Sequence, residues 1–192
     1  MVRTNPERRN ALIDAAIEVL ARDGARGLTF RAVDKEAAVP AGTASNYFPN
    51  RDELFIQAGH RFYERLQPSA ETMNHLFTGP RTRKTIAELM TETVTRITGF
   101  RTGYLALLEL RLEATRRPEL QTILTERVRA DIEFNVRNHL DSGLPGDADS
   151  VILLFLALNW LIVERLTLPG IFGDEEAARL IRVAVDRAIP AL

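Results

Sequence analysis

The sequence lacks cysteine altogether, has a single tryptophan, and carries almost no net charge. Without cysteine it can form no disulfide bond, no thiolate metal site and no cysteine nucleophile, which agrees with a reducing compartment. Its 25 basic and 26 acidic side chains give a net charge of −1, so the chain as a whole does not attract nucleic acid electrostatically. Low-complexity tracts and internal repeats are also missing, as is typical of an ordered globular protein.

Long apolar runs are scarce as well. The longest uncharged stretch, from Ser150 to Val163, is shorter than the roughly 20 residues that a membrane-spanning helix needs. The N-terminal sequence MVRTNPERRN has no apolar core of the kind found in secretory signal peptides. We therefore predict no membrane partner, a buried helix over the uncharged stretch, and a cytoplasmic protein.

Clusters of residues with catalytic or metal-binding chemistry are few. The histidines are His60, His75 and His139, and none of them belongs to a Glu-x-x-His pair or to a zinc-binding run. No serine or threonine lies in a recognisable strand-turn-helix elbow. The sequence therefore predicts a protein that is not an enzyme and binds no metal or cofactor. An enzyme with its chemistry in a helical body is the first alternative.

Helical periodicity and helix caps are present along the whole chain. A stripe of apolar residues begins at Leu12 in a first helix that runs to about Arg22 and ends at Gly24, and Thr29 caps a second helix. Further helices are expected over about residues 40–48, 50–67, 82–98, 101–117, 118–140, 149–168 and 174–189. No strand pattern competes, so we predict an all-α fold of about nine helices.

The stretch from Thr29 to Phe48 is the most informative part of the chain, because it predicts two short helices joined by a tight turn. Its apolar residues are spaced to pack inward, whereas the residues of its second helix are short and polar. The apolar set is Phe30, Val33, Ala37 and Val39, followed by Tyr47 and Phe48, and the polar set is Gly42, Thr43, Ser45 and Asn46. Short polar side chains can bond base edges or phosphates without crowding a groove, which is typical of a helix-turn-helix recognition helix.

The sequence VPAGTASNYFPNRDEL, residues 39–54, resembles the motif of TetR-family transcriptional repressors, and the similarity extends back over ALIDAAIEVLARDGARG, residues 11–27. The resemblance implies a helix-turn-helix DNA-binding domain over residues 1–66 and a helical ligand-binding and dimerisation domain over residues 67–192. It also implies a homodimer that binds a palindromic operator in double-stranded DNA and is released by a small, mostly apolar effector. The motif leaves repression and activation open.

Three residues depart from the commonest form of that motif. Ala38 stands where the turn usually has glycine, so a positive φ there would cost about 1 kcal/mol. Pro40 replaces a serine that would cap the recognition helix. Asp34 replaces a small apolar residue, and we hypothesise that its carboxylate accepts hydrogen bonds from free amides at the start of the recognition helix.

The candidate DNA contacts surround the recognition helix. The predicted base contacts are Thr43, Ser45 and Asn46. The predicted phosphate contacts are Tyr47, Thr29, Arg31 and Arg51, with Arg3, Arg8 and Arg9 as further basic residues on the same face. An asparagine can bind adenine through two hydrogen bonds, which would give sequence specificity. The alternatives are a solvated helix face with the tyrosine in the core, or a dimeric helical adaptor that binds protein and no DNA.

Two C-terminal helices have more apolar surface than the core of one chain is expected to cover. The helix from Val151 to Val163 is apolar nearly all round. The last helix has a second apolar stripe, formed by Ala177, Ala178, Ile181, Ala184, Val185 and Ile189. Pairing of both helices with their symmetry mates predicts a four-helix dimer bundle, and a buried central helix in a monomer is the alternative.

The helices between the DNA-binding and dimerisation regions are expected to surround an effector pocket. Its predicted lining is Phe100, Tyr104, Leu108, Phe134 and Trp160. Three polar groups lie on otherwise apolar stretches and would orient a ligand: Glu109, Asn159 and His139. Such residues are more often hydrogen-bonded core or surface groups, which is the alternative for each of them.

Overall fold

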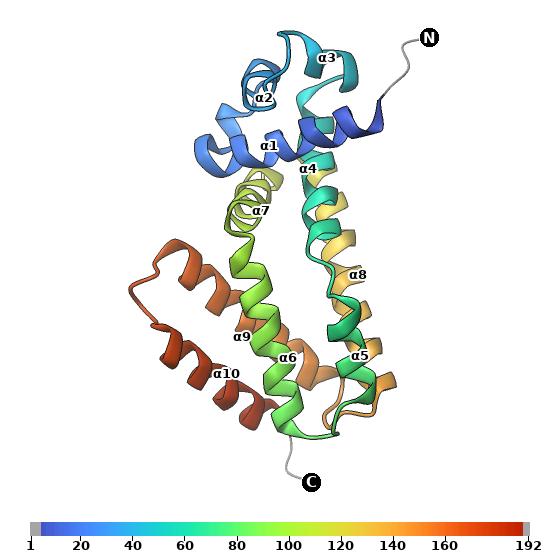
Figure 1. Cartoon of the computed structure of the whole chain (residues 1–192), viewed down its shortest axis with the longest axis vertical. Helices are drawn as coiled ribbons and strands as arrows, with labels where there is room; N and C mark the ends of the chain where they lie inside the picture. Colours follow the sequence, from blue (N-terminus) through green and yellow to red (C-terminus); the bar gives the residue numbers. More distant parts are fainter. Residues whose placement is uncertain (1–4, 190–192) are drawn as a thin grey trace. The chain divides into compact units, whose positions relative to one another are not determined.

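A computed structural model describes residues 5–189, and these residues confirm the predicted all-α fold (Figure 1). They form ten α-helices and no strand. The helices are α1 (Pro6–Gly27), α2 (Phe30–Glu36), α3 (Thr43–Tyr47), α4 (Arg51–Arg65), α5 (Ala70–Thr78), α6 (Arg83–Gly99), α7 (Arg101–Ala114), α8 (Pro118–Ser142), α9 (Ala148–Thr167) and α10 (Asp174–Ala188). The side chains of Asn5, Thr29 and Asn50 accept backbone N–H groups at the starts of α1, α2 and α4, as their cap positions predict.

Helix α5 is an element that the sequence pattern did not predict. Helix α4 ends at Arg65, Pro68 follows without an N–H group to donate, and Ser69 then caps α5 by accepting the N–H of Thr72 at 3.0 Å. No residue of α5 is fully buried, although Leu76 packs against the core of the second unit, and the helix has only nine residues. Periodicity alone therefore gives little indication of it.

The chain divides into two compact units. The first contains the residues up to Gln67 together with Phe100–Glu126, and the second contains Pro68–Gly99 and the residues from Arg127 onward. The boundary predicted after residue 66 lies one residue before the point where the chain first passes from the first unit to the second. The segment Phe100–Glu126, which that prediction assigns to the C-terminal domain, belongs to the first unit.

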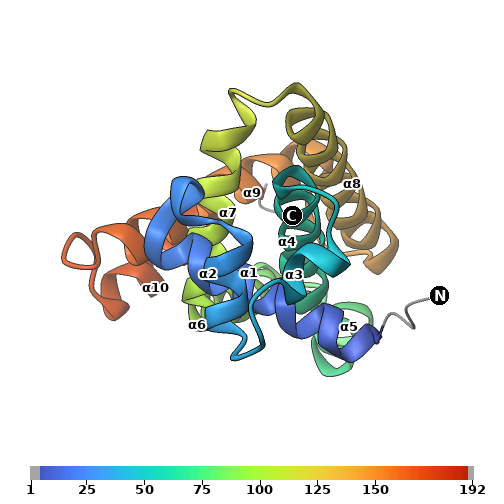
Figure 2. The same ribbon diagram turned by 90° about the horizontal axis from the view of Figure 1, so that it is seen from above.

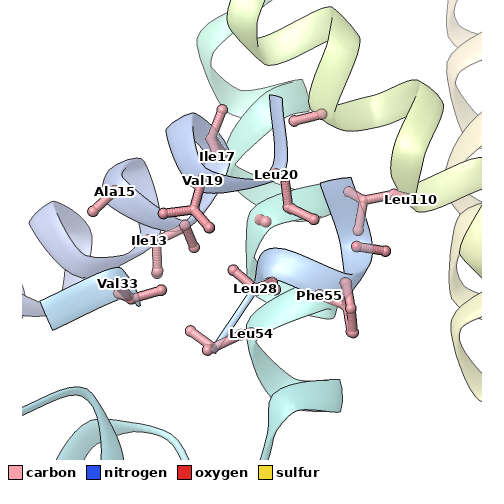
Figure 3. Close-up of a cluster of buried hydrophobic side chains, with 14 of the residues drawn as sticks. Ile13, Ala15, Ile17, Val19, Leu20, Leu28, Val33, Leu54, Phe55 and Leu110 are labelled. Carbon is pink, nitrogen blue, oxygen red and sulfur yellow. The ribbon is translucent and has the colours of Figure 1, made fainter. Parts of the chain in front are cut away.

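The core of the first unit explains why that segment joins it (Figure 3). Ile17 and Leu20 of α1 share one buried cluster with Leu54 and Phe55 of α4 and with Leu110 of α7. Burying a large aliphatic or aromatic side chain contributes roughly 1.5–3 kcal/mol, so α7 is stabilised against α1. Helices α2 and α3 lie at one end of this unit (Figure 1), and seen from above α2 is beside both α1 and α3, against which it packs (Figure 2).

In the second unit α6, α9 and α10 pack together (Figure 1). Ile86 of α6, Leu154 of α9 and Val185 of α10 belong to one buried cluster. The opposite face of α9 exposes large apolar side chains, namely Leu153, Leu156 and Trp160. The predicted helix with apolar residues on all sides is therefore confirmed, but the prediction that it is buried is wrong for this face. By length and composition α9 would also fit a membrane span, and its packing against α6 and α10 accounts for one of its two apolar faces.

The predicted use of the α10 stripe is wrong for most of its residues. Ala177, Ile181, Val185 and Ile189 are buried inside their own unit, so they are not available to pair with a second copy. The reason is that α10 is amphipathic, and its single apolar stripe completes the core of the same chain. Its exposed side has one large apolar residue, Val183.

Candidate nucleic-acid interface

The turn between α2 and α3 is closed by the side chain of Asp34. Its Oδ2 accepts the N–H of Gly42 and its Oδ1 accepts the N–H of Ala44, both at 2.7 Å. Asp34 is only 3% exposed, so water competes little for either bond. The hypothesis that this carboxylate holds free amides at the start of the recognition helix is confirmed.

The same turn contains two left-handed backbone conformations. Ala38 has a φ of 52°, and no other non-glycine residue within 5–189 has a positive φ. Gly42, the N-cap residue of α3, has a φ of 89°. Ala38 thus has the positive φ for which a cost of about 1 kcal/mol is expected from the sequence, a cost that a glycine would avoid.

Helix α3 is shorter than the predicted span of residues 40–48. Pro40 lies in a turn that precedes the helix, where its carbonyl accepts the N–H of Thr43 at 3.1 Å. Gly42 makes no side-chain cap, so the helix has no cap of its own. The carboxylate of Asp34 supplies the bonds that a capping side chain would otherwise supply.

All three predicted base contacts lie on α3, and two of them, Ser45 and Asn46, are exposed. The hydroxyl of the half-buried Thr43 donates to the Pro40 carbonyl at 2.6 Å, and that of Ser45 donates to the Gly42 carbonyl at 2.9 Å. Both hydroxyls keep lone pairs that can accept a hydrogen bond. Asn46 makes no side-chain hydrogen bond to any described residue, so its whole amide is available.

Tyr47 and Phe48 lie at the end of α3. Phe48 is 1% exposed, and Tyr47 is half-buried and packs against the same core cluster. This packing fixes the C-terminal end of the short helix. The phosphate contact predicted for the Tyr47 hydroxyl stays a prediction.

Thr29 and Arg31 are exposed at the start of α2. The Thr29 hydroxyl accepts the N–H of Ala32 at 3.1 Å, which leaves its own proton for a phosphate oxygen. Within the described part of the chain Arg31 makes no ion pair. Both side chains are therefore exposed with hydrogen-bond donors available, and their phosphate contacts stay predictions.

Arg51, in contrast, is engaged inside the protein. Its Nη2 donates to the Ala25 carbonyl at 2.8 Å, and its guanidinium lies 5.6 Å from the centre of the Phe55 ring. The N–H of Ala25 is bound at 3.1 Å by Oε2 of Glu109, beside the kink that Gly24 introduces in α1 with a φ of 69°. A phosphate contact from Arg51 would have to use the guanidinium N–H groups that do not bond the Ala25 carbonyl.

The other basic residues expected on this face differ in their surroundings. Arg9 donates to Gln57 at 3.1 Å and lies 3.6 Å from a carboxylate oxygen of Glu53. Arg8 is exposed. Arg3 lies outside the described residues.

Comparison with known families accounts for this geometry. Residues 81–191 match the family described as "Tetracyclin repressor-like, C-terminal domain", and residues 12–58 match "Bacterial regulatory proteins, tetR family". The chain belongs to the TetR family. As a TetR-family protein it is a DNA-binding transcriptional regulator, and α2 and α3 form its helix-turn-helix.

Individual TetR-family proteins are similar over different lengths. The transcriptional repressor KstR of Mycolicibacterium smegmatis is 32% identical over 65 residues, which are 34% of this chain and 32% of KstR. The match thus spans about a third of that repressor. A solved TetR-family structure from Streptomyces coelicolor A3 is 27% identical, with a TM-score of 0.70, and the match covers 97% of this chain and 100% of that one.

The multidrug binding protein EbrR is a second relative of known structure. Its complex with imidazole is 27% identical, with a TM-score of 0.66 and coverage of 98% of both chains. Its complex with proflavin is 26% identical, with a TM-score of 0.60 and coverage of 95% of this chain and 99% of that one.

The residues predicted to line an effector pocket divide between the two units of this TetR-family protein. Phe100, Tyr104, Leu108 and Glu109 belong to the first unit, and Phe134, Asn159 and Trp160 belong to the second. Tyr104 is buried edge-on against Phe62, and burial raises the pKa of its phenol. Trp160 is 66% exposed and Phe134 is 42% exposed. The pocket therefore stays a prediction.

The polar groups considered for that pocket have partners within the protein. Glu109 binds the Ala25 N–H, as described above, and Asn159 donates to the Phe155 carbonyl at 2.8 Å. Nε2 of the buried His139 donates to the Pro145 carbonyl at 3.1 Å. The alternative interpretation of these three residues was that they are hydrogen-bonded within the protein, and the structure shows such bonds for each of them.

A charged cluster in the second unit was not predicted. On α6, Arg96 Nε donates to Glu92 Oε1 at 2.9 Å. Burial raises the pKa of Asp131 on α8, while the nearby positive charges of Arg127 and Arg96 oppose that shift. Glu92 and Arg96, like Arg127 and Asp131, are four residues apart on a helix, so the sequence contained a signal for each pair.

Proposed function

We propose that the chain is a homodimeric, cytoplasmic repressor that binds a palindromic operator through α3 and is released by a small, mostly apolar effector. The observation that carries the proposal is the contrast within α3. Ser45 and Asn46 are exposed, whereas Ala44 is fully buried and its N–H is held by Asp34. A firmly held helix with short, exposed polar side chains fits the major groove of DNA.

Selection of bound sequences from random duplex DNA tests the DNA-binding half of the proposal. We expect a palindrome whose half-sites are about 34 Å apart, because a dimer presents two recognition helices to successive turns of the groove. The logarithm of the binding constant should fall linearly with the logarithm of the salt concentration, since phosphate contacts release counterions. A helical adaptor would enrich no sequence and show no such slope.

Two variants separate base recognition from phosphate contact. Asn46→Ala should cost about 1–3 kcal/mol and relax the preference at one position of each half-site. Arg31→Ala should weaken binding to all duplexes alike and reduce the salt slope by about 1. Arg187→Ala, at an exposed position of α10, is the control. An Asn46→Ala protein with unchanged preferences would exclude this residue as a base contact.

The exposed apolar face of α9 supports a homodimer. Leu156 and Trp160 lie one helical turn apart and are 59% and 66% exposed. A monomer rarely exposes such a patch, and one recognition helix alone makes few DNA contacts. Two copies that pair through α9 cover the patch and supply the second recognition helix.

The effector half of the proposal rests on the aromatic residues considered above and on EbrR, whose complexes contain imidazole and proflavin. Effector binding would favour a separation of the two recognition helices that no longer matches adjacent grooves, which lowers operator affinity. The chain passes between its two units at residues 67/68, 99/100 and 126/127, so changes in the second unit have three covalent routes to the first.

Proflavin is a suitable first probe, measured by fluorescence polarisation with the protein alone, because the dye also binds DNA. Apolar compounds that displace it can then be tested for release of the operator. Tyr104→Ala should weaken proflavin binding if this residue lines the pocket. If a saturating displacing compound left operator affinity unchanged, the proposed switching would be wrong.

A further inference from the structure

We infer that Asp34 is a positioning residue for operator recognition. Its hydrogen bonds fix the position of α3 relative to α2. They also occupy two amide groups at the start of α3 that could otherwise bind a phosphate. The inference rests on the proposed function of α3 as the recognition helix. It goes beyond that function because Asp34 is buried and touches no DNA itself.

Helix α3 needs an external support because it has little stability of its own. It spans only Thr43–Tyr47, far below the length at which an isolated helix is stable. Its N-cap residue is a glycine with no side chain to bond the first amides, and Pro40, just before it, has no hydroxyl. The first turn of α3 therefore depends on hydrogen bonds from other parts of the first unit.

Asp34 supplies that support with three acceptors at once. Its main-chain carbonyl accepts the N–H of Val39 at 3.0 Å. The two carboxylate oxygens accept the N–H groups of Gly42 and Ala44 at 2.7 Å. Because these two amides are two residues apart at the start of α3, the bonds fix the rotation of α3 about its axis as well as its distance from α2. Hydrogen bonds to a charged acceptor are among the stronger ones in proteins.

The support is itself rigid. Val33, the residue before Asp34, is fully buried in the core of the first unit, and Ala44 on the other side of the two bonds is fully buried as well. Asp34 therefore links two anchored segments. Its carboxylate cannot move without disturbing the packing on one side or the other.

This arrangement has a consequence for DNA contact. Amides at a helix start are common phosphate ligands, but those of Gly42 and Ala44 already have a carboxylate partner. Phosphate binding then depends on side chains such as Thr29 and Arg31 at the exposed start of α2, and not on these two amides. Asp34 thereby affects both the register of the base contacts and the choice of the phosphate contacts.

Operator binding by Asp34 variants tests the inference, with the selected operator and a scrambled duplex measured in parallel. Asp34→Ala should weaken operator binding by about 10- to 100-fold, because two charge-assisted bonds are lost, while binding to the scrambled duplex changes less than about twofold. Asp34→Asn should be intermediate, since its amide keeps one acceptor. Ala106→Gly, at a buried position of α7, is a control that destabilises the same unit without touching α3.

A second measurement distinguishes positioning from general stability. In the wild-type protein, the amide protons of Gly42 and Ala44 should be protected from hydrogen exchange, and in Asp34→Asn at least one should lose that protection. Ala106→Gly should lower stability yet keep the ratio of operator to scrambled affinity. Should Asp34→Ala fail to fold, Asp34→Asn decides the question alone.

The outcomes separate the inference from the function on which it rests. A wild-type protein that does not prefer its selected operator would contradict the proposed function. A wild-type protein with that preference, together with an Asp34→Asn variant that keeps both the preference and the two protected amides, would overturn the inference about Asp34.

Discussion

At Ala38 a single methyl group adds strain to the turn between α2 and α3. The residue has a φ of 52°, a conformation that costs an L-residue about 1 kcal/mol more than glycine. Ala38→Gly should therefore raise the free energy of unfolding by about 0.5–1 kcal/mol, measured by urea denaturation. The same change at the neighbouring Ala37, whose φ is −74°, should lower it, because glycine there adds freedom to the unfolded chain and removes a methyl group that packs against the core. Equal effects at both positions would show that the turn is not strained.

The residues of the turn also show what a sequence can predict about a site. Ala38 and Asp34 were predictable because each replaces a residue whose role in the motif has a physical reason, a positive φ or a packed turn. Arg51 was less predictable. Its spacing from α3 suggests a phosphate contact, but its hydrogen bond to the Ala25 carbonyl joins segments far apart in the sequence. No local pattern encodes such a partner.

At the scale of the elements, the apolar periodicity of the sequence predicted most of the helices. It did not predict which part of the protein covers the apolar stripe of each helix. The apolar stripe of α10 was visible in the sequence, and both a second copy and its own unit were possible partners. The structure places Ile181 and Val185 in the core of the same chain. Helix α5 was missed for another reason: its nine residues make only about two and a half turns, which is too short for a clear periodic pattern.

The end of α8 should make stability depend on pH. Burial lowers the pKa of His139 there, and its hydrogen bond to the Pro145 carbonyl only partly opposes the shift. The unfolded chain then binds a proton at a higher pH than the folded one. The free energy of unfolding should fall as the pH drops below about 6.5, and level off below the folded pKa.

Thermal or urea denaturation between pH 5 and pH 8 measures this dependence. His139→Gln should remove a part of the loss at low pH, because glutamine has no proton to gain. His60→Gln, at an exposed position of α4, serves as the control. Identical pH profiles for the His139→Gln and wild-type proteins would show that the buried imidazole does not govern the effect.

At the scale of the whole molecule, the domain division after residue 66 stays a prediction, and the packing of the chain groups one segment differently. The segment Phe100–Glu126 belongs to the first unit because Leu110 packs into its core. An apolar helix such as α7 fits either core equally well by its sequence. Only the three-dimensional packing decides between them.

The quaternary structure gives the last prediction. The exposed face of α9 presents Trp160, 66% exposed, and a charge placed there would have to be desolvated in an interface between two copies. Trp160→Glu should therefore convert a dimer into a monomer at micromolar concentration in sedimentation velocity, with an unchanged helical circular dichroism spectrum. Operator affinity should fall with it, because a monomer contacts one half-site only. Gln121→Glu, exposed on α8 in the first unit, adds the same charge elsewhere and should leave both properties unchanged. If Trp160→Glu sedimented as a dimer with full operator affinity, the second copy would have to bind through another face.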